Sequence, residues 1–113
     1  MVVDNLISTL ERLGYPVIKQ GSLAPNESYP DHFLTYWNNS SDGESYFDNE
    51  EGAAIWNFSV NSYSVDEPQS ILMKAKKELK QEGFIVTGFG HDVASDEATH
   101  TGRGITALYR EQL

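Results

Sequence analysis

The segment from residue 91 to residue 100, HDVASDEATH, concentrates the side chains of this chain that are best suited to bind a metal ion. Two imidazoles together with a carboxylate can hold a divalent metal, and a bound metal could activate water for a hydrolase. The pattern of this segment is not helical, so no regular spacing places these ligands on one face. We therefore expect a polar loop without a metal site, and keep a metal-dependent hydrolase as the third hypothesis. The residues concerned are His91, Asp92, Asp96, Glu97 and His100.

Two Gly-x-Gly pairs could cradle a phosphate group, one at residues 88–90 and one at residues 102–104. Neither pair has the third glycine of a dinucleotide motif, and neither lies between a strand and a following helix. We expect turns and strand ends at both places.

The acidic stretch 42–51, DGESYFDNEE, differs from a calcium-binding loop because Phe47 occupies the position that needs glycine. The chain also has no serine-nucleophile motif and no HExxH helix. Paired carboxylates such as Glu50 and Glu51 could act as acid and base, but no pattern predicts a pocket that would shift their pKa values. We therefore expect no catalytic residue, no metal, no cofactor and no enzymatic activity.

Two helices follow from apolar residues that recur with a helical period. The first is predicted at residues 4–13, with Asp4 as its cap, and the second at residues 67–82. Asp66 can cap the second helix, and Gln69 stands where a capping box needs it. Each helix is followed by a glycine that can take a positive φ and end it.

Strands are predicted at residues 17–19, 32–39, 53–64, 84–89 and 101–110. The strand 53–64 is the clearest, because Trp56, Phe58 and Val60 alternate with small polar residues. Residues 20–31, 40–51 and 91–100 are expected to be loops. The order is therefore α-β-β-β-α-β-β, in a single domain over residues 1–113. We expect an α+β fold in which an antiparallel sheet, or a mixed one, carries both helices on one face.

The strand 32–39 places Phe33 and Trp37 on one face and Tyr36 on the other. One interpretation is a core on one face and a half-covered ring on the other. The alternative is an exposed aromatic side chain that anchors a protein interface.

Composition excludes several classes of protein. A hydrophobic fraction of 39% and an aromatic fraction of 12% are too high for a disordered chain. The absence of cysteine excludes disulfide scaffolds, thiol catalysis and the common zinc modules, and suits a cytoplasmic origin. No apolar run approaches the roughly 18 residues of a membrane span, and the N-terminus lacks the basic region of a signal peptide. We therefore expect no membrane partner.

The charge is strongly negative and unevenly distributed. Seventeen Asp and Glu against eight Lys and Arg give a net charge of −9, which disfavours specific nucleic-acid binding. Acidic residues gather in one loop, and basic residues gather on one helix. Both surfaces could simply be solvated, or the acidic loop of one copy could meet the basic helix of a neighbour. The acidic loop contains Asp42, Glu44, Asp48, Glu50 and Glu51. The basic helix face contains Lys74, Lys76, Lys77 and Lys80.

Several phrases occur along the chain in a distinctive order: PVIKQG, YPDHFLTYW, IWNFSVNSYS, a lysine-rich helix, EGFIVTGFG and TALYR. In this order they resemble the tail terminator and head–tail joining family of long-tailed phages and prophages. The resemblance extends over about residues 4–111 and rests on the order of elements and on these phrases.

The resemblance implies a small α+β subunit without enzymatic activity that forms a ring, commonly a hexamer. Such a ring would lie in the virion at the head-proximal end of the tail, between the tail tube protein and the head connector or adaptor. The protein itself would be made in the cytoplasm of the bacterial host. DNA would only pass through the opening as cargo, and a lumen lined by carboxylates would repel its phosphates.

Within this family the sequence leaves tail terminator and head-side adaptor open. The acidic loop is a candidate for the lumen or for the subunit interface, and the lysines for the complementary surface. The alternative from another class is a small acidic binding module, such as an inhibitor that mimics DNA.

Overall fold

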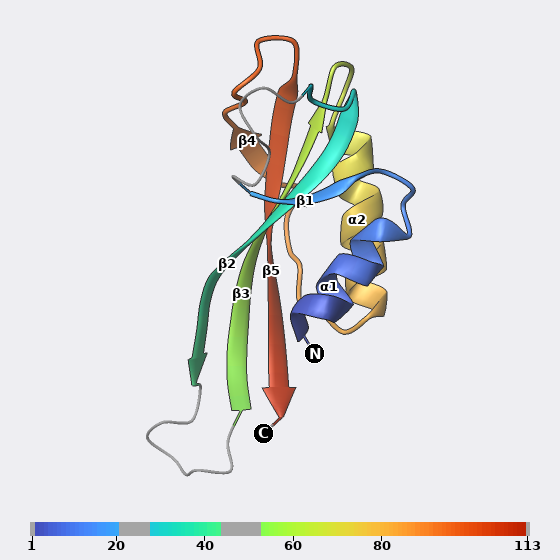
Figure 1. Ribbon diagram of the computed structural model, residues 1–113. Coiled ribbons are helices and arrows are strands. Elements are labelled where there is room, and N and C mark those ends of the chain that lie inside the picture. The colour runs from blue at the N-terminus through green and yellow to red at the C-terminus, as the bar shows by residue number, and fades with distance from the viewer. Residues whose placement is uncertain (1, 21–27, 44–52, 113) are drawn as a thin grey trace.

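The computed structural model describes residues 2–20, 28–43 and 53–112. Its elements follow the predicted order α-β-β-β-α-β-β (Figure 1). They are α1 (Val2–Glu11), β1 (Val17–Lys19), β2 (His32–Gly43), β3 (Ala53–Ser64), α2 (Gln69–Gln81), β4 (His91–Val93) and β5 (Thr101–Gln112).

The strands form one sheet in the order β1-β2-β3-β5-β4. The short strand β1 runs parallel to β2, whereas the β2–β3, β3–β5 and β4–β5 pairs are antiparallel. Both helices lie on the same face of this mixed sheet (Figure 1). The α+β fold predicted from the sequence is therefore confirmed.

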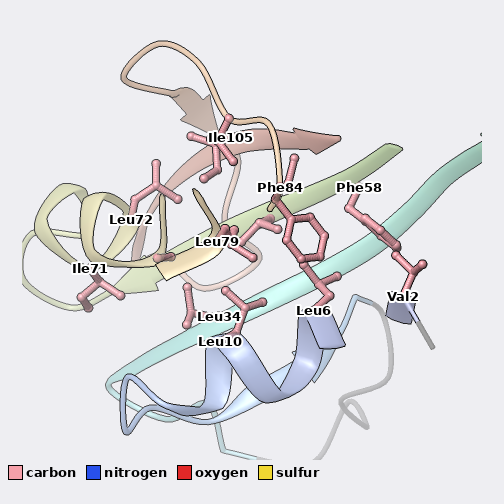
Figure 2. Packing of buried hydrophobic residues seen from close by; sticks show 14 residues of the cluster. Val2, Leu6, Leu10, Leu34, Phe58, Ile71, Leu72, Leu79, Phe84 and Ile105 are labelled. Carbon is pink, nitrogen blue, oxygen red and sulfur yellow. The ribbon is translucent and has the colours of Figure 1, made fainter. Parts of the chain in front are cut away.

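The core lies between the helices and one face of the sheet (Figure 2). The predicted alternation in β3 is confirmed, because Phe58 and Val60 are fully buried against the helices. Ile105 and Ala107 of β5 stand beside them in the register and face the same side. Their helical partners in the core are Leu6, Leu10, Ile71, Leu72, Ala75 and Leu79.

Three strands continue past the helices as a narrow arm (Figure 1). We define the arm by the backbone of residues 41–43, 53–55 and 110–112, which lie side by side in β2, β3 and β5. The strand β1 pairs only with residues 34–36 and β4 only with residues 102–104, so neither reaches the arm. Residues 44–52 connect the two strands at the end of the arm and lie outside the described residues.

The predicted strand at residues 84–89 is wrong. This segment contributes only one bridge to the sheet, in which Ile85 and Leu108 exchange backbone hydrogen bonds of 2.7 and 3.0 Å. The extended chain ends at Gly88, whose φ is +77°. The strand forms instead at β4, within the segment 91–100 that was predicted to be a loop, because the edge of β5 is open there.

The ends of the other elements also differ from the prediction. Helix α1 begins at Val2, so Asp4 lies in its first turn and is not its cap. Helix α2 begins after Pro68 without a side-chain cap, and Asp66 donates its backbone N–H to the Ser64 hydroxyl at 2.9 Å. In its place a carboxylate oxygen of Glu67 accepts the N–H of Ser70 at 3.2 Å. The strand β2 runs to Gly43, beyond the predicted end at residue 39.

Candidate functional site

Helix α2 presents a basic groove on its outer side. Because Ile71, Leu72, Ala75 and Leu79 face the core, residues 73, 76, 77 and 80 share another side of the helix. There they border a shallow hollow of about 470 Å³, and none of its described lining residues is acidic. We call this hollow the lysine groove; it is lined by Met73, Lys76, Lys77, Lys80 and Gln81. The structure therefore brings three of the four predicted lysines together, while Lys74 is exposed outside the groove.

The carboxylates of α2 lie away from the groove. Glu78 and Glu82 both face Arg12, the residue that follows α1, with N–O distances of 3.4 and 3.2 Å. None of the four lysines of α2 makes an ion pair with a carboxylate in the described part of the chain. Within the part of the chain that the structure describes, no carboxylate therefore neutralises their positive charge.

Beside the lysine groove, the turn 88–90 displays a phenylalanine. Gly88 and Gly90 have φ of +77° and +91°, and between them the side chain of Phe89 is 75% exposed. A Cβ on Gly90 would lie 2.8 Å from the carbonyl oxygen of Gly104, so the turn needs glycine there. The expectation of a turn at this Gly-x-Gly pair is confirmed.

Side chains from α2 and β5 hold this turn in place. The carbonyl oxygen of Phe89 accepts hydrogen bonds from Gln69 at 2.9 Å and from Arg103 at 3.1 Å. The ammonium group of Lys76 donates to the carbonyl of Gly88 and lies 5.2 Å from the centroid of the Phe89 ring. The exposed ring is thus fixed next to the groove, which lowers the entropy cost of using it in an interface.

The predicted acidic site lies mostly outside the described residues. Glu44, Asp48, Glu50 and Glu51 belong to the undescribed connection at the end of the arm. Asp42 lies in β2 in register with Ile55, and its side chain is not described. The predicted acidic site therefore stays a prediction.

The sheet face opposite the helices carries a second hollow, of about 430 Å³. Phe33 and Tyr63 stack there with ring centroids 5.1 Å apart, and burial raises the pKa of the Tyr63 phenol. The phenol therefore stays protonated at neutral pH and cannot serve as a base. The lining residues are Ile18, Lys19, Gln20, Tyr29, Phe33, Thr35, Tyr63, Ala94, Ser95 and Asp96.

The sequence did not predict this hollow, although the aromatic alternation of β2 indicated that its rings occupy both faces. Tyr36 packs against the core on the helix side. Trp37 is 44% exposed and lies under the ammonium group of Lys19, 5.8 Å from its ring centroid. The prediction that Tyr36 lies on the opposite face from Phe33 and Trp37 is confirmed, whereas the sequence did not indicate which of the two faces the helices cover.

The segment 91–100 does not bring its potential ligands together. Asp92 pairs with Arg103 at 2.8 Å, and Asp96 accepts a 3.4 Å hydrogen bond from Tyr29. His100 is bonded through Nε2 to the carbonyl of Pro30 at 2.8 Å. Within residues 2–20, 28–43 and 53–112, no group of three or more His, Asp or Glu side chains is placed to hold a metal ion.

The comparisons with known proteins add no relative. No protein-family model matches the chain, and no curated protein sequence matches it. Among the helices that the structure describes, none is long and apolar enough to cross a membrane.

Proposed function

We propose that this protein is a non-enzymatic structural subunit of a long-tailed phage or prophage, a tail terminator or head–tail joining protein that forms a hexameric ring. Two kinds of observation support the proposal. The order of sequence phrases over about residues 4–111 resembles that family. The observation that carries the proposal is the arm, which extends past the helical layer (Figure 1).

We expect the arm to be stabilised by contact with another molecule. A ribbon of two or three strands without a layer packed over it gains little stability by itself. Among the residues that the structure describes, neither β1 nor β4 pairs with the outer strands of the arm, because they pair with residues 34–36 and 102–104. Open edges are sites where another chain can add. Assembly with neighbouring subunits would protect both the arm and its edges.

A closed ring requires two different contact surfaces on each subunit. The chain has such a pair, since the acidic stretch is at the end of the arm and the lysine groove is on α2. Reciprocal contact of the same two surfaces would instead give a twofold dimer, so the mass of the assembly distinguishes the two arrangements.

The acidity of the protein fits a ring through which DNA passes. With a net charge of −9, the assembled subunits would repel phosphates and would leave DNA free to slide. The ring would contact the tail tube protein on one side and the head connector or adaptor on the other, at the head-proximal end of the tail.

Light scattering on a sizing column, over a range of concentrations, tests the ring. We expect a discrete species with six times the chain mass of 12.7 kDa. A monomer at every concentration would contradict the proposal, and a one-to-one complex with a nuclease or repressor would favour the inhibitor alternative.

The position in the virion needs a second experiment. In the encoding phage, loss of this gene should leave heads and tails unjoined, and added protein should restore joining in the lysate. Complete virions in the absence of the protein would contradict the proposed place at the head–tail junction.

A further inference from the structure

We propose that the lysine groove of α2, together with Phe89, binds the acidic stretch 42–52 of a second copy of this chain. The inference rests on the proposed self-assembly and names the two surfaces that make the contact. It requires complementary charge, a place for an aromatic side chain, and an arrangement in which the two surfaces of one molecule do not meet each other.

The charges are complementary and are not neutralised within the described chain. Lys76, Lys77 and Lys80 line the groove, whereas Glu78 and Glu82 are held on the other side by Arg12. The acidic stretch has five carboxylates and no basic residue. Contact between an acidic loop and a basic groove accelerates association and fixes the register of the two partners.

The aromatic side chains match as well. Within residues 40–51, Tyr46 and Phe47 are the only large apolar residues. Phe89 is 75% exposed and lies against Lys76, so the groove offers an apolar surface directly beside its charges. Interfaces obtain much of their binding energy from aromatic anchors of this kind, surrounded by polar contacts.

The described end of the arm is separated from the lysine groove by the length of the sheet. Phe58 packs in the core, and from there β3 continues to Ala53 over five residues, about 16 Å of extended chain. Figure 1 shows this end of the arm pointing away from α2. Residues 44–52 follow at that end, so we assign them to the groove of a neighbour.

Charge exchange between two variants tests the contact with full-length chains. The tip variant carries Glu44→Lys, Asp48→Lys, Glu50→Lys and Glu51→Lys, which changes the charge of the acidic stretch from −5 to +3. The groove variant carries Lys77→Glu and Lys80→Glu, which changes the charge of the three groove lysine positions from +3 to −1. Each should lose association with itself at least about tenfold, because like charges then face each other at every contact. An equimolar mixture should assemble again, because both kinds of contact in an alternating ring are complementary.

A chain with all six substitutions provides an internal check. Its basic tip meets an acidic groove, so it should assemble alone as the wild type does. This rescue excludes misfolding as the cause of the losses, since a misfolded chain would not recover when charges are added.

Matched controls restrict the effect to the proposed surface. Lys74→Glu makes the same charge change on the same helix outside the groove, and should leave association within about twofold of the wild type. Phe89→Ser should weaken association without changing the net charge. The effect of the groove variant should also fall in about 1 M salt, where the screening length is about 3 Å.

The outcomes separate this inference from the proposed function. If the wild type forms rings and both the tip and the groove variant do so equally well, the groove is not the contact, although the ring proposal stands. If charge exchange restores association but the products are dimers or open polymers, the contact is correct and the ring is wrong. Failure of the mixture and of the sixfold variant to assemble, with wild-type rings present, would also overturn the contact.

Discussion

The two faces of the sheet bury side chains in different ways. On the helix face, large apolar residues such as Leu34, Phe58 and Ile105 are buried beneath α1 and α2. On the opposite face, Asn61 and Tyr63 lie over the backbone of β5, at the positions of Gly104 and Gly102. Helices therefore cover one face, whereas on the other face side chains of β3 pack over glycines of β5.

This difference indicates which face provides most of the stability of the fold. Apolar burial against the helices provides most of the free energy of folding. We expect the opposite face, the arm and the outer side of α2 to contribute less. Variants on neighbouring residues of one strand can measure this division directly.

The largest effect is expected for Phe58→Ala. The side chain is fully buried among the core residues, so its removal should lower the free energy of unfolding by about 3–5 kcal/mol. The neighbouring Ser59 points to the opposite face and accepts a 2.9 Å hydrogen bond from Asn39. Ser59→Ala should cost only about 0.5–1 kcal/mol. Urea unfolding of both variants makes the comparison, and equal losses would show that the faces do not differ.

An intermediate effect is expected at the two glycines of β5 over which side chains of β3 pack. A Cβ on Gly102 would approach the carbonyl oxygen of Val93 to 2.8 Å, which only backbone movement can relieve. On Gly104 it would meet Asn61 Oδ1 at 2.3 Å, the end of a side chain that can move. We expect Gly102→Ala to lower the free energy of unfolding by about 2–3 kcal/mol and Gly104→Ala by about 1–2 kcal/mol.

A double-mutant cycle sharpens that prediction. Asn61→Ala removes the atom that the new methyl group on Gly104 would meet, so it should recover part of the loss from Gly104→Ala. It should recover nothing from Gly102→Ala. Simple additivity in both cycles would argue against the packing of Asn61 over β5.

A smaller effect concerns the pH dependence of the opposite face. Burial raises the pKa of the Tyr63 phenol in the folded chain above its ordinary value of 10.0. The unfolded chain therefore loses this proton first, and folding stability falls as the pH rises above about 10. Tyr63→Phe should lose less stability between pH 9 and pH 11 than the wild type does. Parallel unfolding curves at these two pH values would contradict this contribution.

The smallest effect on stability is expected for Phe89→Ser. The ring is mostly exposed, and the turn is held through the backbone carbonyls, so unfolding should change by less than about 0.5 kcal/mol. Association should nevertheless weaken. A large loss of stability would mean that the ring belongs to the core and not to an interface.

Much of the fold could be predicted because it follows from local periodicity. The strands 17–19 and 53–64 have the predicted bounds, and the predicted alternating residues of β3, Trp56, Phe58 and Val60, are buried or packed against the core. Side chains of a strand alternate whatever their partners are, so the pattern of one segment is sufficient. The caps were predicted less well, because Asp66 is engaged with Ser64 at the end of β3.

The lysine groove could be predicted only in part. The sequence indicated a basic face on the second helix, and α2 confirms the clustering of Lys76, Lys77 and Lys80. It could not predict that Arg12 forms ion pairs with Glu78 and Glu82, at the C-terminal end of the same helix. It also could not predict the turn that places Phe89 beside Lys76, since the segment 84–89 reads as a strand.

The sequence by itself determined the two helices, the apolar side of the strand 53–64, and the separation of acidic from basic segments. These properties depend on residues close together in the chain. Only the tertiary structure decided the parallel pairing of β1 with β2, the strand at 91–93 and the arm. The physical reason is that edge pairing and ion pairs join distant residues. Their free energy depends on which surfaces the packed core leaves open.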